Sequence, residues 1–175
     1  FESQIAVIPE DSPRRPSITQ INAKKPSPAT IAAVMYWEEF DAATEGRILL
    51  KSDQASIVDS MARSVRRHPV YSEYMTEGRR ELSMLWRDAR SQVPCKARFD
   101  LLRDDGIAID LKSARDASAD GFGRAAGSMN YHIQAAWYGN AHEHLLDRSL
   151  SAFVFIAVEN EAPFATAVYV AQSNA

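Results

Sequence analysis

The chain has 175 residues, of which 46% are hydrophobic and 25% charged, and its formal net charge is −3. This composition fits one compact soluble domain, and the acidic balance argues against a protein that coats nucleic acid by bulk attraction. A single cysteine, Cys95, excludes an intramolecular disulfide and any four-cysteine zinc or iron–sulfur site within one chain. We therefore expect a cytoplasmic protein without a membrane span.

Residues 1–30 are predicted to form an extended N-terminal arm. Five of the eight prolines lie between residues 9 and 28, together with four basic side chains, and this mixture disfavours packed elements. Residues 31–175 are expected to form the single domain. Because the chain begins with Phe1 rather than Met, we also expect that a segment preceding it is missing.

Two helices are predicted after the arm. Ser27-Pro28 is typical of an N-cap followed by proline in the first turn, so a helix should run from there to about residue 40. Its apolar stripe is expected to contain Ile31, Val34 and Met35. A second helix is predicted over residues 53–67, with an apolar face made of Ile57, Val58, Met61 and Val65.

From residue 81 onward the pattern favours strands, near 81–87, 96–103 and 107–113. A helix is predicted over residues 127–146, followed by strands over 152–158 and 165–171. The expected fold is therefore a mixed α/β domain with a central sheet of about five strands flanked by helices.

The segment around Asp104-Asp105-Gly106 predicts a β-hairpin with a three-residue loop. That loop pairs Leu101 with Ile109 and places Asp100 opposite Asp110. Arg98 and Lys112 then lie opposite each other on the face that carries both aspartates. The other face is expected to form a continuous apolar surface made of Phe99, Leu101, Ile107, Ile109 and Leu111.

Facing carboxylates repel each other, so Asp100 and Asp110 bring a hairpin no structural benefit. A divalent cation removes that problem, and hard oxygen ligands suit Mg²⁺ or Mn²⁺, which hold a phosphate and activate a water. Lys112 can orient that water or stabilise charge in the transition state. The competing interpretation is structural: Asp100 ends a strand and Lys112 is a solvated edge residue.

Basic residues gather around this hairpin. Residues 79–115 hold nine Lys or Arg against six Asp or Glu, whereas residues 31–60 and 116–175 each sum to −4. The pattern indicates either a solvated surface or a phosphate-binding surface around an acidic metal site. Under the second interpretation, the predicted DNA-binding residues are Lys96, Arg98 and Arg115.

The predicted helix over residues 127–146 places Gln134 and Tyr138 one turn apart, with Tyr131 just before them. These side chains lie away from the face that bears Met129, Ile133 and Ala136. If the helix covers the hairpin, the amide and the phenol could contact phosphate or hold a metal-bound water. Otherwise this is an amphipathic helix whose polar residues face solvent.

Four stretches together resemble the RecE (exonuclease VIII) family of phage and prophage nucleases, within the PD-(D/E)xK superfamily. They are residues 81–83, 95–100, 109–117 and 131–138. The resemblance covers most of the chain and implies a magnesium-dependent exonuclease that degrades duplex DNA ends in the 5′→3′ direction. It also implies a 3′ overhang passed to a strand-annealing protein in recombination, and a ring-shaped oligomer with tetramers as the precedent.

The resemblance implies Asp100 and Asp110 as ligands of Mg²⁺ or Mn²⁺ and Lys112 as the catalytic lysine. It puts Glu81 in the place of an upstream acidic residue near the metal, and we include Leu111 in the predicted metal-binding set. Two further residues match the Gln-x-x-x-Tyr motif of the RecB-like branch and are counted as catalytic, namely Gln134 and Tyr138.

Two points stay open at this stage. RecE-like nucleases carry a metal-binding histidine on an upstream helix, and none of His68, His132, His142 and His144 matches its motif. We expect these four to be surface or satisfied core histidines. The same site residues would also serve a PD-(D/E)xK endonuclease, and a non-catalytic DNA-binding or assembly module could retain the fold.

Overall fold

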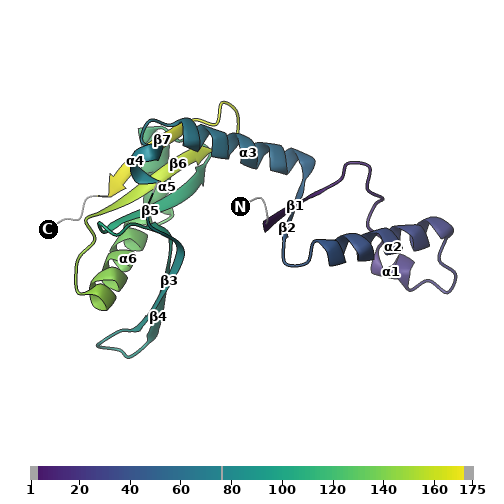
Figure 1. Ribbon diagram of the computed structural model, residues 1–175, viewed down its shortest axis with the longest axis horizontal. Helices are drawn as coiled ribbons and strands as arrows, with labels where there is room; N and C mark the ends of the chain where they lie inside the picture. The colour runs from purple at the N-terminus through teal and green to yellow at the C-terminus, as the bar shows by residue number, and fades with distance from the viewer. Residues whose placement is uncertain (1–3, 76, 172–175) are drawn as a thin grey trace. The chain divides into compact units, whose positions relative to one another are not determined.

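The computed structural model describes residues 4–75 and 77–171 (Figure 1). The chain divides into two compact units, Phe1–Val58 and Asp59–Ala175, which we call the N-terminal and C-terminal units. The first three residues of the predicted arm lie outside the described residues. In the part that is described, no helix has the length and hydropathy needed to cross a membrane.

The N-terminal unit is built around a pair of short parallel strands. Strand β1 (Ile5–Ile8) pairs with β2 (Ile48–Lys51), and the chain between them forms α1 (Ile18–Ile21) and α2 (Pro28–Ala43). The predicted extended arm is thus wrong in part, because it contains a strand and a short helix. Helix α1 forms because Ser17 and Gln20 make a reciprocal capping box. The domain boundary proposed at residue 30 stays a prediction.

Helix α2 begins as the sequence predicts, but it buries a different face. The side chains it buries are Ala33 and Trp37, whereas Ile31 and Met35 are exposed. The Trp37 indole N–H donates a hydrogen bond of 3.0 Å to the carbonyl of Pro13. The proline-rich segment therefore packs on the Trp37 side of α2, and the predicted apolar stripe was wrong.

Helix α3 (Ser52–Arg67) runs across the division between the units and confirms the second predicted helix. The C-terminal unit then continues in the order α4 (Tyr71–Tyr74), β3 (Arg79–Arg87), β4 (Pro94–Leu102), β5 (Ile107–Ala114), α5 (Ala119–Ser128), α6 (Tyr131–Leu146), β6 (Ala152–Glu159) and β7 (Thr166–Ala171). Its sheet has the strand order β3-β4-β5-β6-β7, and β5 and β6 are parallel while the other neighbours are antiparallel. The predicted mixed sheet of about five strands is confirmed.

Helices cover both faces of this sheet, as the alternation along β6 shows (Figure 1). Phe153, Phe155 and Ala157 pack in one cluster with side chains of α5 and α6. The residues between them, such as Val154 and Ile156, pack in a second cluster with side chains of α3 and α4. We call these the α6 face and the α3 face of the sheet. Because both faces are buried, β6 is apolar at nearly every position.

The helix predicted over residues 127–146 is interrupted. Asn130 has a left-handed backbone with φ of 58°, so α5 ends before it and α6 begins after it. Most of α5 was not predicted, because glycines such as Gly121 are poor helix formers. Here Gly121 is required, since a Cβ at that position would collide with the side chain of Asp116. Close packing of the loop before α5 thus overrides helix propensity.

Candidate active site

The hairpin between β4 and β5 has the predicted register near its loop. Gly106 adopts φ of 85°, and the Arg103 N–H donates to the Ile107 carbonyl at 2.9 Å. Leu101 pairs with Ile109 and Leu102 with Ala108. These two pairs are the whole backbone ladder between β4 and β5 in the described residues, whereas β5 pairs with β6 along its full length.

Asp100 lies where this ladder ends. Its Oδ2 accepts a hydrogen bond of 2.9 Å from the backbone N–H of Leu111. A carboxylate thus takes the place of a backbone carbonyl as the partner of Leu111. The strands that carry Asp100 and Asp110 are adjacent and antiparallel, as predicted, but the two aspartates are not ladder partners.

An irregularity in β3 explains this arrangement. Glu81 has φ of 52°, and the β3–β4 register skips the pair that it would form with Asp100. As a result Phe99 packs on the α6 face, whereas Leu101 packs on the α3 face. The predicted continuous apolar surface through Phe99 and Leu101 was therefore wrong. Leu111, also placed on that surface, is 43% exposed.

Asp110 is the buried acidic residue of the site, at 5% exposure. The Gln134 side-chain amide on α6 donates a hydrogen bond of 2.5 Å to its Oδ1, and the Lys112 Nζ lies 2.7 Å from its Oδ2. The Lys112 ammonium also donates to Oε1 of Gln134 at 2.9 Å, which closes a triangle of side chains. Asp110 Oδ2 is ion-paired, but no donor among the described residues is aligned to hydrogen-bond it.

The Lys112 side chain is only 20% exposed. Its Nζ lies 4.6 Å from the centre of the Tyr131 ring, at the start of α6. A cation over an aromatic face is stabilised by the ring quadrupole, so Tyr131 helps to hold the ammonium near Asp110. The sequence placed Tyr131 near Gln134, but nothing in it signalled this contact with the lysine.

Burial raises the pKa of the half-buried Asp100 carboxyl above its ordinary value, and the negative charges of Asp110 and Glu81 raise it further. The Leu111 N–H and the Lys112 ammonium lower this pKa and partly offset the rise. The local field thus disfavours a second negative charge beside Asp110. A bound divalent cation would reverse that preference.

The predicted metal-binding residues do not all lie together in the structure. The Glu81 carboxylate forms an ion pair with Arg98, and both side chains are more than half exposed. In residues 4–75 and 77–171, no three His, Cys, Asp or Glu side chains lie close enough to hold a metal ion. The two aspartates remain, and their hard oxygen donors, including the Asp110 Oδ2 without an aligned donor, fit Mg²⁺ or Mn²⁺. The metal-binding roles of Glu81 and Leu111 stay predictions.

Helix α6 does cover the hairpin, with the side that carries Gln134 and Tyr138. Gln134 reaches Asp110, whereas Ile133, one position earlier on the helix, is 56% exposed. The alternative in which Gln134 and Tyr138 face solvent was therefore wrong. Polar side chains face the sheet here because buried partners satisfy their hydrogen bonds.

Tyr138 anchors β4 in this structure. Its hydroxyl donates a hydrogen bond of 2.8 Å to the carbonyl of Arg98, and its ring packs against Phe99 and Phe153. One position earlier, the Trp137 indole N–H donates to the Lys96 carbonyl at 3.1 Å, a contact that the sequence did not signal. In the protein alone, the phenol thus holds the strand that carries Asp100.

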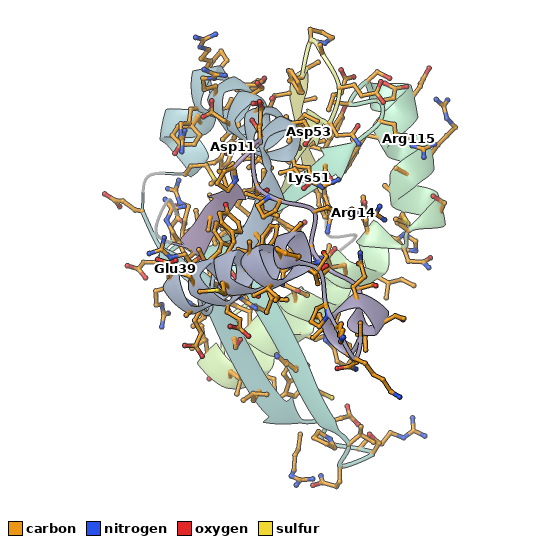
Figure 2. The ribbon with its side chains drawn as sticks, turned by 90° about the vertical axis from the view of Figure 1, so that its right-hand side faces the viewer. Asp11, Arg14, Glu39, Lys51, Asp53 and Arg115 are labelled. Carbon is orange, nitrogen blue, oxygen red and sulfur yellow. The ribbon has the colours of Figure 1, made fainter. Side chains whose placement is uncertain are left out.

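The three predicted DNA-binding residues are all exposed. Lys96 and Arg98 are alternate residues of β4, so they project from the same side of the strand. Arg115 lies at the surface just after β5 ends (Figure 2). Arg98 does not face Lys112, because no ladder joins their strands at that level. Among the histidines, His142 is fully buried with its Nδ1 2.7 Å from the Arg148 carbonyl, but its Nε2 has no hydrogen-bond partner in the described residues, so it is a core histidine that is satisfied at one nitrogen.

This sheet, with two aspartates and a lysine on its central hairpin, defines a PDDEXK-like nuclease fold. Residues 27–175 match the family described as "PDDEXK-like domain of unknown function (DUF3799)". The chain therefore belongs to that family. No comparison singles out the RecE family, so that closer assignment stays a prediction.

Two solved structures are similar to the chain. A protein from Eubacterium rectale named "Putative exonuclease" superposes with a TM-score of 0.60 at 15% identity, over 82% of this chain and 55% of the other. The chain thus spans little more than half the length of that protein, and the likeness shows the fold alone. The structure of SSO0001 has a TM-score of 0.38 at 16% identity, over 78% of this chain and 59% of the other. A search of curated proteins found no match.

Proposed function

We propose that this protein is a metal-dependent nuclease that hydrolyses phosphodiester bonds of DNA. The observation that carries the proposal is the triangle of Asp110, Lys112 and Gln134 beside Asp100, on the hairpin of a PDDEXK-like fold. Burying an acid and a lysine together is costly and gives a fold little net stability. Such a pair is better explained by chemistry on a charged substrate.

Asp100 and Asp110 are the residues that would hold the metal. When bound, a divalent cation such as Mg²⁺ or Mn²⁺ supplies Lewis-acid polarisation of the phosphate and lowers the pKa of a water molecule. Asp110 is preorganised for this role, because Gln134 fixes one carboxylate oxygen and leaves the other beside Lys112. Asp100 is preorganised in the same way by the Leu111 N–H.

Lys112 is the group placed to stabilise negative charge on the phosphate during hydrolysis. In the protein alone, its ammonium balances the charge of Asp110. The Gln134 amide donates to the aspartate and accepts from the lysine, so it acts as a positioning residue for both. An amide suits this position because it offers a donor and an acceptor and adds no charge.

We further propose duplex DNA ends as the substrate, degraded in the 5′→3′ direction with Mg²⁺ to leave overhangs for recombination. The support is the resemblance of the hairpin and of α6 to the RecE family. Lys96, Arg98 and Arg115 would contact phosphates, since all three are exposed and lie on or just after the strands that carry the aspartates. A strand-annealing partner and a ring-shaped assembly belong to the same proposal.

The test is digestion of end-labelled linear duplex beside covalently closed circular duplex, each with Mg²⁺ or with EDTA. We expect Mg²⁺-dependent release of label from the linear substrate and none from the circle, with Asp110→Asn as the inactive control. Cleavage of the circle would identify an endonuclease instead. Absence of cleavage on both substrates would leave a DNA-binding module and overturn the nuclease proposal.

A further inference from the structure

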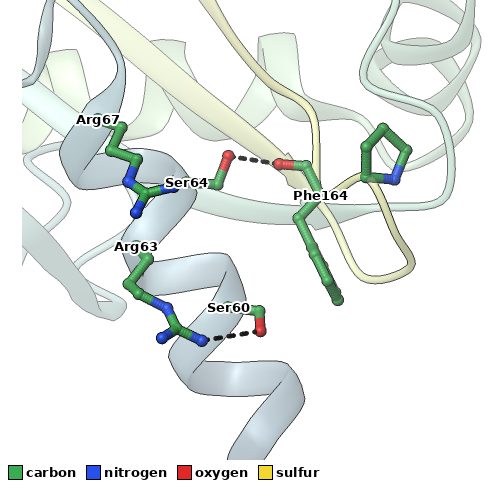
Figure 3. Close-up of a pocket in the computed structure, with 6 residues that line it drawn as sticks. Ser60, Arg63, Ser64, Arg67 and Phe164 are labelled. Carbon is green, nitrogen blue, oxygen red and sulfur yellow. Dashed lines mark hydrogen bonds between the residues drawn. The ribbon is translucent and has the colours of Figure 1, made fainter.

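A second polar site lies on the α3 face of the sheet, apart from the aspartates. It is a pocket of about 430 Å³ between α3 and the turn that joins β6 to β7 (Figure 3). Its lining residues are Ser60, Arg63, Ser64, Arg67, Pro163 and Phe164. The volume falls within the range of roughly 300–1,000 Å³ typical of ligand pockets. None of these residues belongs to the nuclease site described above.

The spacing along α3 builds one wall of the pocket. Arg63 and Arg67 are four residues apart, as are Ser60 and Ser64, so all four side chains lie along one side of the helix. Figure 3 shows them opposite Phe164. The helix therefore presents two guanidinium groups and two hydroxyl groups to a single space.

The turn between β6 and β7 builds the other wall. The Ser64 hydroxyl donates a hydrogen bond of 2.5 Å to the carbonyl of Phe164 and lies 2.9 Å from the hydroxyl of Thr166. Phe164 has a left-handed backbone with φ of 59°. That conformation is unfavourable for a bulky residue and persists only where neighbouring groups fix it. The hydrogen bond from Ser64 thus helps to fix the backbone at Phe164, whose half-buried side chain lines the pocket.

The two arginines are available to a ligand. Arg63 pairs with Asp59 at 3.0 Å, but both side chains are more than half exposed, and an exposed pair of this kind is easily exchanged for another anion. Within residues 4–75 and 77–171, the side chain of Arg67 has neither a salt bridge nor a hydrogen bond. The pocket therefore holds a guanidinium group, that of Arg67, which no acidic side chain in the described part of the chain neutralises.

We propose that this pocket binds a segment of single-stranded DNA, with Arg63 and Arg67 on phosphates and the Phe164 ring stacked on a base. The proposal rests on the proposed function, in that DNA is the substrate. Basic groups that follow the backbone, combined with an aromatic face for the base, are the usual means of binding a single strand. A paired base has no free face for a ring set in a pocket, so the partner is unpaired DNA.

The location suits a strand that enters or leaves the nuclease site. Strands β5 and β6 are parallel, so they end at the same edge of the sheet, where the Asn160 N–H donates to the Ala114 carbonyl at 3.0 Å. Lys112 lies two residues before Ala114, and the turn with Phe164 follows Asn160. A single strand passing around this edge would run from the α6 face to the pocket on the α3 face.

The experiment is fluorescence anisotropy of the full chain with a short fluorescein-labelled oligothymidylate in EDTA, where no cleavage occurs. Arg63→Gln and Arg67→Gln should each weaken binding at least three-fold and reduce the slope of log affinity against log salt by about 0.7. Phe164→Leu should weaken binding about five-fold or more through lost stacking. Arg66→Gln is the matched control, since Arg66 is exposed on the same helix but does not line the pocket, and it should bind like the wild type.

Arginine variants that bind no more weakly than Arg66→Gln would overturn the proposal, and so would equal competition by an unlabelled duplex. If Phe164→Leu binds the oligothymidylate as tightly as the wild type does, the pocket binds only phosphate, and the proposed stacking on a base is overturned. Thermal unfolding checks the fold of Phe164→Leu, and the exposed arginines test the pocket even if that variant unfolds. Pocket variants that lose binding in a protein that cleaves no DNA would support the pocket while the nuclease proposal fails. If the wild-type protein cleaves DNA and the pocket variants bind the oligonucleotide normally, the nuclease proposal stands and the pocket proposal fails.

Discussion

The two faces of the sheet hold their charged side chains in different ways. On the α6 face, Asp110 and Lys112 are largely buried and share one amide. On the α3 face, Arg63 and Arg67 stand exposed along a helix. Buried charges are fixed in position before any ligand arrives, as bond hydrolysis requires. Exposed arginines can adjust to a flexible ligand. The comparison separates a region suited to chemistry from a region suited to holding DNA.

Lys112→Ala tests the contrast between the two faces and should have the largest effect, a loss of cleavage rate. We expect the rate of DNA cleavage at saturating DNA to fall about 10²–10³-fold, because in the proposed function the Lys112 charge acts on the transition state. Duplex affinity measured in Ca²⁺ should change less than two-fold. Arg115→Ala is the comparison variant and should weaken binding with little change in the saturated rate. A normal saturated rate for Lys112→Ala would reduce this lysine to a phosphate contact.

Gln134→Leu tests whether the α6 face depends on the shared amide. This substitution keeps the size of the side chain but removes both hydrogen bonds, so Asp110 and Lys112 lose their fixed geometry. We expect single-turnover cleavage to fall about 10–100-fold and Mg²⁺ affinity to fall by a similar factor. Gln134→Glu keeps the acceptor for Lys112 but adds a charge beside Asp110, so it should not rescue activity. If Gln134→Leu cleaves normally, the amide has no positioning role.

Asp110→Asn should lower stability as well as abolish Mg²⁺ binding. The loss of one partner from a largely buried ion pair leaves Lys112 uncompensated, which costs about 1–3 kcal/mol and lowers the Tm by about 3–10 °C. The repulsion between the two aspartates, which is all that the sequence shows, would instead predict unchanged or slightly raised stability. Differential scanning calorimetry without metal measures the difference. A Tm equal to that of the wild type would show that the ion pair contributes nothing.

The smallest effect is expected for Asp100→Asn in the absence of metal. The folded protein holds the Asp100 proton more tightly than the unfolded chain, so the pKa is raised from its ordinary 3.8. This stabilising contribution is complete below that value and is lost as the pH rises through the folded-state pKa. At neutral pH the ionised carboxylate is thus unfavourable, and Asp100→Asn should raise the Tm by about 2 °C. The difference should vanish in acid, and a gain that persists there would contradict this assignment.

The sequence predicted those parts of the site that follow from local periodicity. The glycine loop and the alternating residues were sufficient to pair Leu101 with Ile109, and the spacing of four residues was sufficient to put Gln134 and Tyr138 on one face of α6. It did not predict the left-handed residues Glu81 and Asn130, because neither is glycine and only tertiary contacts hold them. Those two residues account for the change of face at Asp100 and for the split between α5 and α6.

The pocket on the α3 face could not be predicted for a different reason. Ser64 and Phe164 are 100 positions apart in the chain, and neither lies in a motif. The same limitation applied to the N-terminal unit, where β1 pairs with β2 across more than forty positions. Without an alignment, nothing in a single sequence indicates that such distant segments meet. The pairing of β1 with β2 turned a segment that its prolines made look unstructured into part of a compact unit.

The hydrogen bonds of α6 restrict how this helix can vary in length. Gln134 holds the Asp110 carboxylate, and Tyr138, one turn later, holds the carbonyl of Arg98. A residue inserted between them would rotate one contact by about 100° relative to the other and shift it by about 1.5 Å. The outward side chains, such as Ile133, make no comparable demand. Among homologous proteins, α6 should therefore tolerate many substitutions on its outer surface but no insertion or deletion between these two residues.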